Sequence, residues 1–415
     1  MRALFINLSH PGISHVSGVR IPSFAQAMAQ RGHQIVLLTK TLGEDDAGTE
    51  REGLVRALNE NDCSKRLHVT VKPEENLFAK LRAGRFPRPL SKVITAWAFQ
   101  LYGGVYADWS KSAAQIEPIL AERFRPEVVW ATFLPSDAYV IAQRLATLAR
   151  CPWVADLKDA WTHRLPIGLR KSLAQRFRYT RFLTSNSRFH GEQGERWFKR
   201  KVVTLYDGIA EEFLQVNQGP TANGFRITLV GGTYGEEALA GFLRGLGGWV
   251  LSLPEKTRHL VRFTYAGSDE EKVRTVLERL FPRKQPCDSV IWGYLPLARL
   301  AEICGGAAVN TYLWLPGSFH HKLLELLACG RPLIAFPGEN EESKELASCL
   351  GGDLYICRNE KELDSTLSEL WITRNDRSKV KNSTEVLRSF TWPSRVAFLE
   401  EILTEVVNRD QRFNR

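Results

Sequence analysis

The sequence lacks the features that mark secreted, zinc-binding and membrane-spanning proteins. Its seven cysteines are odd in number, scattered, and form no C-x-x-C pair, which argues against both a disulfide framework and a zinc ribbon. No apolar run approaches the roughly 18 residues that a spanning helix needs. Residues 1–9 lead into a strand-like pattern without the layout of a cleavable signal. We therefore expect a cytoplasmic protein that does not cross the membrane.

The common cofactor and metal motifs are also missing. The chain has no D-x-D, no Walker loop, no zinc-ligand spacing, no internal repeat and no low-complexity tract. The loop at residues 9–18 is rich in Gly, Ser and His but lacks G-x-G-x-x-G, so a nicotinamide dinucleotide has little support. We expect no cofactor and no bound metal.

Size and charge divide the chain in two. Its 415 residues and 44% hydrophobic content are enough for two hydrophobic cores, since single cores seldom grow beyond about 250 to 300 residues. Residues 1–215 hold 31 Lys and Arg against 21 Asp and Glu, whereas residues 216–415 hold 25 of each. The excess of positive charge therefore lies in the first half. It indicates an anionic partner, which could be a phospholipid surface, a phosphorylated acceptor or nucleic acid.

The first forty residues predict the opening of a doubly wound parallel sheet. Residues 3–8 form an apolar strand pattern, residues 19–31 a helix that ends at Gly32, and residues 33–39 a second strand. In such sheets, ligands bind beyond the carboxyl ends of the strands.

A second informative stretch is residues 311–336. An apolar strand ends at Pro-Gly-Ser, residues 316–318, and a helix is expected from about residue 320 to residue 329. A helix start after such a break leaves N–H groups available for an anion. Lys322 and Glu325 share one helix face, where a carboxylate suits a ribose diol. An amphipathic helix with a surface ion pair is the alternative.

This stretch, K-x-x-E-x-x-A-x-G-x-P from Lys322 on, resembles the nucleotide-sugar loop of the family-4 glycosyltransferases, which are retaining enzymes of the GT-B fold. Further resemblances follow in the family's order at residues 31–35 (RGHQI), 156–161 (D-x-K-D-x-W) and 202–209. The resemblance implies that Glu325 binds the ribose. The family's second glutamate, which touches the donor sugar, is Gly317 here.

The same resemblance supplies candidate site residues. The carboxylates Asp156 and Asp159, at a strand end with His163 close behind, are candidate catalytic groups on the acceptor side, although either carboxylate could instead cap the next helix. Glycines at the strand-to-helix turn of residues 231–235 allow close approach of a phosphate. The candidate donor-binding residues are Gly232, Thr233, Tyr234, Gly293, Tyr294, Ser318, Phe319, His320, Lys322 and Glu325.

Two basic segments mix cations with apolar side chains. Residues 77–106 interleave aromatics with Lys and Arg, and residues 164–201 carry eleven Lys and Arg against two Glu. Such patterns suit a membrane-surface segment, and a core helix with a solvated basic face explains residues 77–106 about as well. The expected contacts with an anionic membrane are Arg164, Arg170, Lys171, Arg176, Arg178 and Arg181, with residues 77–92 as a second contact.

The sequence thus predicts an α/β protein of the GT-B class, with two Rossmann-like doubly wound domains facing a central cleft. Residues 1–215 would bind the acceptor, residues 216–388 the nucleotide sugar, and residues 389–415 would form a helix that crosses back. The implied activity is metal-independent, retaining transfer from a UDP-sugar substrate to a cell-surface glycan or lipid-linked acceptor, on the inner face of the cell membrane.

Two alternatives to a glycosyltransferase have less support from the sequence. An epimerase of the same fold would need no basic, aromatic acceptor face, so the charge asymmetry counts against it. A nucleic-acid-binding protein would show a recognition module or stacking aromatics on a sheet, and neither is present. We therefore expect no nucleic-acid partner.

Overall fold

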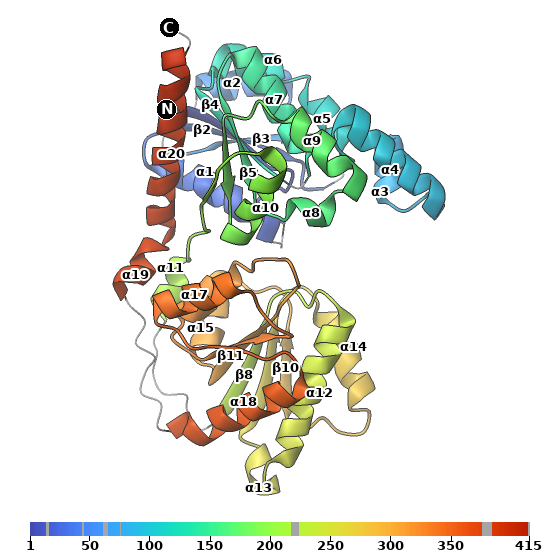
Figure 1. Cartoon of the computed structure of the whole chain (residues 1–415), viewed down its shortest axis with the longest axis vertical. Helices are drawn as coiled ribbons and strands as arrows, with labels where there is room; N and C mark the ends of the chain where they lie inside the picture. Colours follow the sequence, from blue (N-terminus) through green and yellow to red (C-terminus); the bar gives the residue numbers. More distant parts are fainter. Residues whose placement is uncertain are drawn as a thin grey trace. The chain divides into compact units, whose positions relative to one another are not determined.

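The computed structural model describes residues 1–13, 16–43, 45–60, 65–74, 76–133, 135–216, 224–375 and 384–413. The chain forms two compact units, one of Met1–Asp207 with Trp392–Arg415 and one of Gly208–Thr391 (Figure 1). Each unit is built on one parallel sheet with helices packed against it. The predicted class, two doubly wound α/β domains, is confirmed.

The sheet of the first unit has seven strands in the order β3-β2-β1-β4-β5-β6-β7, and all neighbours are parallel. Because all strands run in one direction, their carboxyl ends lie along one edge of the sheet. The strands are β1 (Arg2–Ile6), β2 (Gln34–Lys40), β3 (Leu67–Val71), β4 (Val128–Thr132), β5 (Trp153–Leu157), β6 (Phe182–Ser185) and β7 (Val202–Thr204).

Both faces of this sheet are buried, as the uninterrupted apolar pattern of its strands requires. Phe5 faces a core that includes α1 (Arg20–Gln30) and the carboxyl-terminal helix α20 (Trp392–Phe413). Ile6 faces the opposite core. Helices around that opposite face are α2 (Arg51–Asn59), α5 (Ala107–Ala113), α6 (Glu117–Ile119), α7 (Asp137–Ala149), α9 (Arg170–Arg176) and α10 (Arg188–Phe198).

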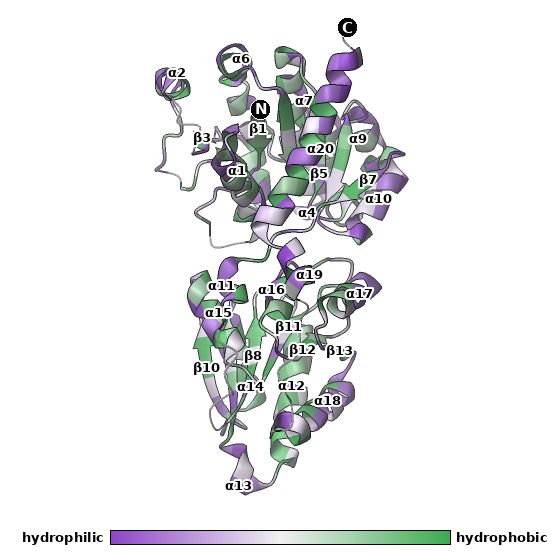
Figure 2. Ribbon diagram, turned by 90° about the vertical axis from the view of Figure 1, so that its left-hand side faces the viewer, coloured by the Kyte–Doolittle hydropathy of each residue, from purple (hydrophilic) through white to green (hydrophobic). Residues whose placement is uncertain are grey.

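The second unit has a six-stranded parallel sheet in the order β10-β9-β8-β11-β12-β13. In Figure 2 its central strands β8 and β11 are coloured as hydrophobic, consistent with their burial. The strands are β8 (Phe225–Val230), β9 (Val261–Ala266), β10 (Asp288–Trp292), β11 (Val309–Leu313), β12 (Leu333–Phe336) and β13 (Leu354–Ile356).

One face of the second sheet packs on three helices, α12 (Glu236–Ser252), α14 (Glu270–Leu280) and α18 (Glu360–Ile372). Trp249 of α12 lies fully buried in this core. The remaining helices of the unit are α11 (Glu211–Leu214), α13 (Glu255–Arg258), α15 (Leu297–Gly305), α16 (Lys322–Ala328), α17 (Glu341–Leu350) and α19 (Thr384–Ser389).

Candidate functional site

The turn after β8, residues 231–235, is held in place at the carboxyl edge of the second sheet. Thr233 is fully buried, and both its N–H and its hydroxyl donate to Asp269 at 2.7 and 2.9 Å. The Tyr265 hydroxyl donates to the Gly231 carbonyl at 2.9 Å. Asp269 and Tyr265 both come from β9 or the loop after it, so the neighbouring strand fixes the shape of the turn.

Lys322, the first residue of α16, reaches into this turn. Its ammonium donates to the Val230 carbonyl at 2.9 Å and lies 5.2 Å from the ring centre of Tyr234 and 5.8 Å from that of Tyr312. A Cβ on residue 231 would lie 2.4 Å from Nζ, and Gly231 has a φ of +85°. Glycine is therefore required at residue 231 for both its backbone conformation and the passage of the lysine.

Two groups at this edge titrate near neutral pH. Burial lowers the pKa of Lys322 to about 7, against the opposing attraction of Asp269 and Glu339. Burial also raises the pKa of Glu339 to about 6, although the Tyr312 hydroxyl and the Asn340 N–H both donate to its carboxylate. An incoming anion would therefore favour the protonated, charged form of the Lys322 amine, and this amine lies close to the Glu339 carboxylate.

His320 orients Tyr234. Its Nε2 accepts from the Leu315 N–H at 3.0 Å, so in the neutral ring Nδ1 carries the proton and donates to the Tyr234 hydroxyl at 3.0 Å. Tyr234 has a φ of +52° and its side chain is 46% exposed. Non-glycine residues in this left-handed region cluster at ligand sites, and the Tyr234 ring is exposed at this edge of the sheet.

The segment before α16 differs from the expected helix start. The helix begins at Lys322, two residues later than predicted. Before it, residues 315–318 form a turn in which the Ser318 N–H donates to the Leu315 carbonyl at 3.0 Å. Gly317 has a φ of +78° in this turn, a conformation that a glutamate would adopt only with strain. The turn thus explains why the family's glutamate is missing.

The other predicted donor residues lie on the same sheet edge. Glu325 accepts from the His321 Nε2 at 3.2 Å and its side chain is 12% exposed. Gly293 and Tyr294 follow β10, and Tyr294 is 53% exposed. Ser318 is partly exposed and Phe319 is buried. Their contact with a donor remains a prediction.

Sequence reasoning missed Asp269, Glu339 and Tyr312. Asp269 and Glu339 both lie in short loops directly after strands, which is where ligands bind in this class of sheet.

In the first unit, Asp156 is fully buried and bound by four donors. It accepts from Arg20 Nε at 3.0 Å, Arg20 Nη2 at 2.8 Å, Thr132 at 3.1 Å and Thr184 at 2.8 Å. Both carboxylate oxygens are thereby occupied. The expectation that Asp156 contacts substrate is corrected: its carboxylate anchors the start of α1 to the sheet.

Arg20 also pairs with Asp207. Burial lowers the pKa of Arg20, but Asp156 and Asp207 outweigh it and hold that pKa above its ordinary value. A buried guanidinium needs compensating charge, which explains the acidic residue at position 207.

Asp159 remains available as a polar group at the end of β5. It is partly exposed, and the helix α8 (Trp161–Arg164) has no side-chain hydrogen bond at its N-cap, Ala160, so neither carboxylate serves as the cap that was the alternative. Beside it, the buried Lys158 ammonium has no hydrogen-bond partner in the described part of the chain, and burial lowers its pKa. The side chain of His163 is outside the described residues.

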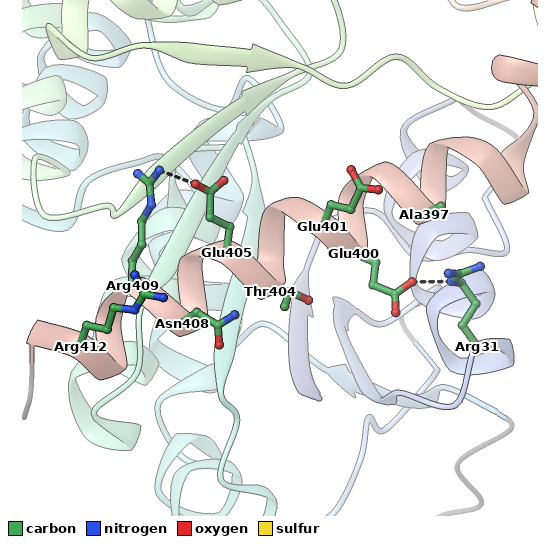
Figure 3. A pocket seen from close by; sticks show the side chains of 9 residues that line it. All are labelled: Arg31, Ala397, Glu400, Glu401, Thr404, Glu405, Asn408, Arg409 and Arg412. Atoms are coloured by element: carbon green, nitrogen blue, oxygen red, sulfur yellow. Dashed lines mark hydrogen bonds and ion pairs between the residues drawn. The ribbon is translucent and has the colours of Figure 1, made fainter.

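A separate groove of about 740 Å³ runs along α20 (Figure 3). Arg31 and Glu400, which form an ion pair of 2.6 Å across it, face each other in the figure. Arg31 precedes β2, so the groove lies at the amino ends of the strands, opposite the edge where ligands bind. It is lined by Arg31, Ala397, Glu400, Glu401, Thr404, Glu405, Asn408, Arg409 and Arg412.

The described residues provide neither a metal-binding cluster nor a helix that could span a bilayer. They contain no group of three or more His, Cys, Asp or Glu side chains arranged to hold a metal ion. No helix within the described ranges combines the length and apolarity that a bilayer span needs.

Comparison with known proteins gives a family match in the first unit and a fold match over the whole chain. Residues 17–191 match the model of the glycosyl transferase 4-like domain. Anabaena HepE, solved in complex with UDP and glucose, superposes with a TM-score of 0.65 at 14% identity, covering 98% of this chain and 100% of that chain. No curated protein matches the sequence significantly.

Two further structures show the same architecture. Sucrose-phosphate synthase from Thermosynechococcus elongatus has a TM-score of 0.68 at 12% identity, covering 98% of this chain and 99% of that chain. The UDP-forming trehalose-phosphate synthase from Burkholderia xenovorans has a TM-score of 0.63 at 12% identity, with the same coverage. At these identities the likeness shows the fold, which is GT-B.

Proposed function

We propose that this chain, a GT-B protein whose residues 17–191 form a glycosyl transferase 4-like domain, transfers a sugar from a UDP-sugar to an acceptor. The observation that carries the proposal is Lys322, whose ammonium is held in a glycine turn at the carboxyl edge of the second sheet. A cation at the end of a Rossmann-like strand is suited to a diphosphate. Anabaena HepE has been solved with UDP-glucose, and this supports uridine and glucose as the first choice.

On the donor side, Lys322 would neutralise the diphosphate beside the backbone of residues 231–235. Glu325 would accept from the ribose hydroxyls, as the resemblance implies, and Tyr294 would offer its exposed ring to the base. Glu339 would supply the carboxylate toward the sugar that Gly317 cannot provide. The nucleotide sugar is a substrate, and the proposal includes no cofactor and no metal.

On the acceptor side, Asp159 is the candidate polar contact in the first unit, and Arg20 with Asp156 would position it by fixing the end of β5. The proposed acceptor is a cell-surface glycan or a lipid-linked sugar, and transfer would retain the anomeric configuration, as the resemblance implies.

A donor panel tests the proposal. UDP, GDP, dTDP and CMP sugars are compared by thermal shift, and release of the nucleotide is followed without acceptor. We expect stabilisation by UDP-sugars, lost in Lys322→Met and kept in the control Lys344→Met, which removes an exposed lysine of α17. Failure of every nucleotide sugar to bind at millimolar concentration would overturn the proposal.

A further inference from the structure

Helix α4 (Arg88–Tyr102) exposes a stripe of large apolar side chains. Leu90, Val93, Trp97 and Leu101 are 47%, 66%, 43% and 53% exposed. Their spacing of three and four residues places them on one face of the helix. In Figure 1, α4 and the short helix α3 (Leu77–Arg82) project from the side of the first unit beyond α9. Exposed apolar side chains grouped on one helix face are typical of an interaction site, so the stripe indicates a binding partner.

The rest of α4, with Ala98 and Phe99 buried, is fixed to the protein, and Trp97 at the edge of the stripe also contacts α3. Phe78 of α3 stacks on Trp97 at 6.1 Å and meets Tyr102 edge-on at 5.4 Å, and Ala98 is buried between the helices. Arg176 of α9 donates to the Gln100 carbonyl at 3.1 Å. The helix is therefore apolar on two faces, one packed on the unit and one open to solvent.

The segment that carries this stripe and the segment of α9 that contacts α4 are both rich in positive charge. Residues 77–102 contain five Lys and Arg, residues 164–181 contain six, and neither segment contains an Asp or Glu. Ile167, in the short 3-10 helix of residues 167–169 that contacts α4, is 79% exposed and adds an apolar side chain beside it. In these two segments, the cations that are exposed and form no ion pair among the described residues are Lys80, Arg85, Arg88, Lys92, Lys171 and Arg178.

We propose that α3 and α4 form a docking surface for an anionic lipid bilayer, with the stripe of Leu90, Val93, Trp97 and Leu101 inserted at the level of the headgroups and the surrounding cations paired with lipid phosphates. A two-dimensional anionic partner with an apolar interior matches both the charge and the apolarity of the surface. The idea that the docked protein uses a lipid-linked acceptor rests on the proposed function. The proposal that α3 and α4 bind an anionic bilayer does not depend on that function.

The proposed docking surface differs from the one expected from the sequence, which centred on the basic segment of residues 164–181. Arg170 donates to the carbonyls of Leu165 and Thr162, and Arg176 holds the end of α4. Arg181 pairs with Asp410 at 2.8 Å. These three arginines stabilise the fold, so replacing them would confuse unfolding with loss of lipid binding. Lys171 and Arg178 remain as exposed flanking cations.

Vesicle flotation of the full chain tests the proposal with two variants and a control. Val93→Ser with Leu101→Ser removes apolarity, and Arg85→Gln with Arg88→Gln and Lys92→Gln removes charge. The control, Leu148→Ser with Leu251→Ser, removes side chains of similar exposure, each 52% exposed, from other surfaces. Melting curves and UDP affinity are measured for all, so loss of fold or of donor binding is distinguished from loss of docking.

We expect the wild type and the control to float with phosphatidylglycerol vesicles and not with phosphatidylcholine vesicles. Because each cation near an anionic surface is worth about 1 kcal/mol, the triple charge variant should bind about a hundredfold more weakly. The apolar variant should lose the part of binding that resists salt. Absence of flotation by the wild type, or equal binding by all variants, would overturn the proposal. So would a wild-type dimer that the apolar variant dissociates in sedimentation, since the stripe would then serve self-association.

Discussion

Binding of UDP should be accompanied by the uptake of a proton at Lys322. The pKa of its ammonium in the free protein is about 7, and a diphosphate placed beside it favours the charged form. At pH 8 only about a tenth of the free protein carries this proton, so saturation with UDP should take up about 0.9 proton per site. The phosphates of UDP are already ionised at this pH, so they contribute little to the count.

The lowered pKa of Lys322 also determines how the affinity for UDP and the free energy of unfolding each change with pH. Above pH 7 each further pH unit should weaken UDP binding by up to about tenfold, or 1.4 kcal/mol, because protonation of Lys322 must accompany binding. The folding stability of the free protein should change with pH in the opposite direction. The pKa in the folded state lies below the ordinary value of 10.5, so the unfolded chain binds more protons in this window. The free energy of unfolding should therefore rise between pH 7 and pH 10.

Calorimetry at pH 8 in two buffers of different ionisation enthalpy measures this proton directly. Wild type and the control Lys344→Met should show an observed enthalpy that differs between the buffers by about 0.9 of the difference in their ionisation enthalpies. Lys322→Met should bind more weakly and show no difference. An enthalpy that is identical in both buffers for the wild type, or proton uptake that survives in Lys322→Met, would refute the assignment.

Four further substitutions separate the other candidate roles. Glu325→Ala should weaken UDP binding by about 1.5 to 3 kcal/mol without lowering the melting temperature, and unchanged affinity in calorimetry would remove Glu325 from the site. Asp159→Asn should lower turnover and leave UDP affinity unchanged, whereas Asp156→Asn should cost about 3 to 5 kcal/mol of folding stability because the buried Arg20 loses compensating charge; equal destabilisation by both would contradict this division. Glu339→Gln should weaken UDP-glucose relative to UDP, and an unchanged ratio of the two affinities would show that Glu339 does not face the sugar.

The fold class was predictable because its signal is local and repeated. A parallel strand buried on both faces gives a short apolar run, and the helix that follows it gives a polar start and a glycine end. Residues 3–8 and residues 33–39 illustrate this, since they became β1 and β2 with shifts of only one or two residues. Both sheets came out parallel, as this alternation of strand and helix predicts.

The roles of charged residues were less predictable because their partners are distant in sequence. Asp156 looked like a reactive strand-end carboxylate, yet its partner Arg20 lies 136 residues away, beyond any local pattern. Helix α4 posed a different problem. Its apolar residues cover two faces, so periodicity alone could not say which of them, Phe99 or Trp97, would be buried. Only the packing of α3 and α9 distinguishes the two.

The loss of the family's glutamate at Gly317 and the presence of Glu339 have a common structural explanation. Strands β11 and β12 are neighbours in register, with Leu313 opposite Phe336, so the loops that follow them leave the sheet side by side. The Tyr312 hydroxyl, on β11, donates to the Glu339 carboxylate, which shows that the β12 loop reaches the end of β11. Once the turn at Gly317 needs a left-handed backbone, a carboxylate at that position is disfavoured. The adjacent loop can provide one at the same edge, against the same tyrosine, without strain in the turn.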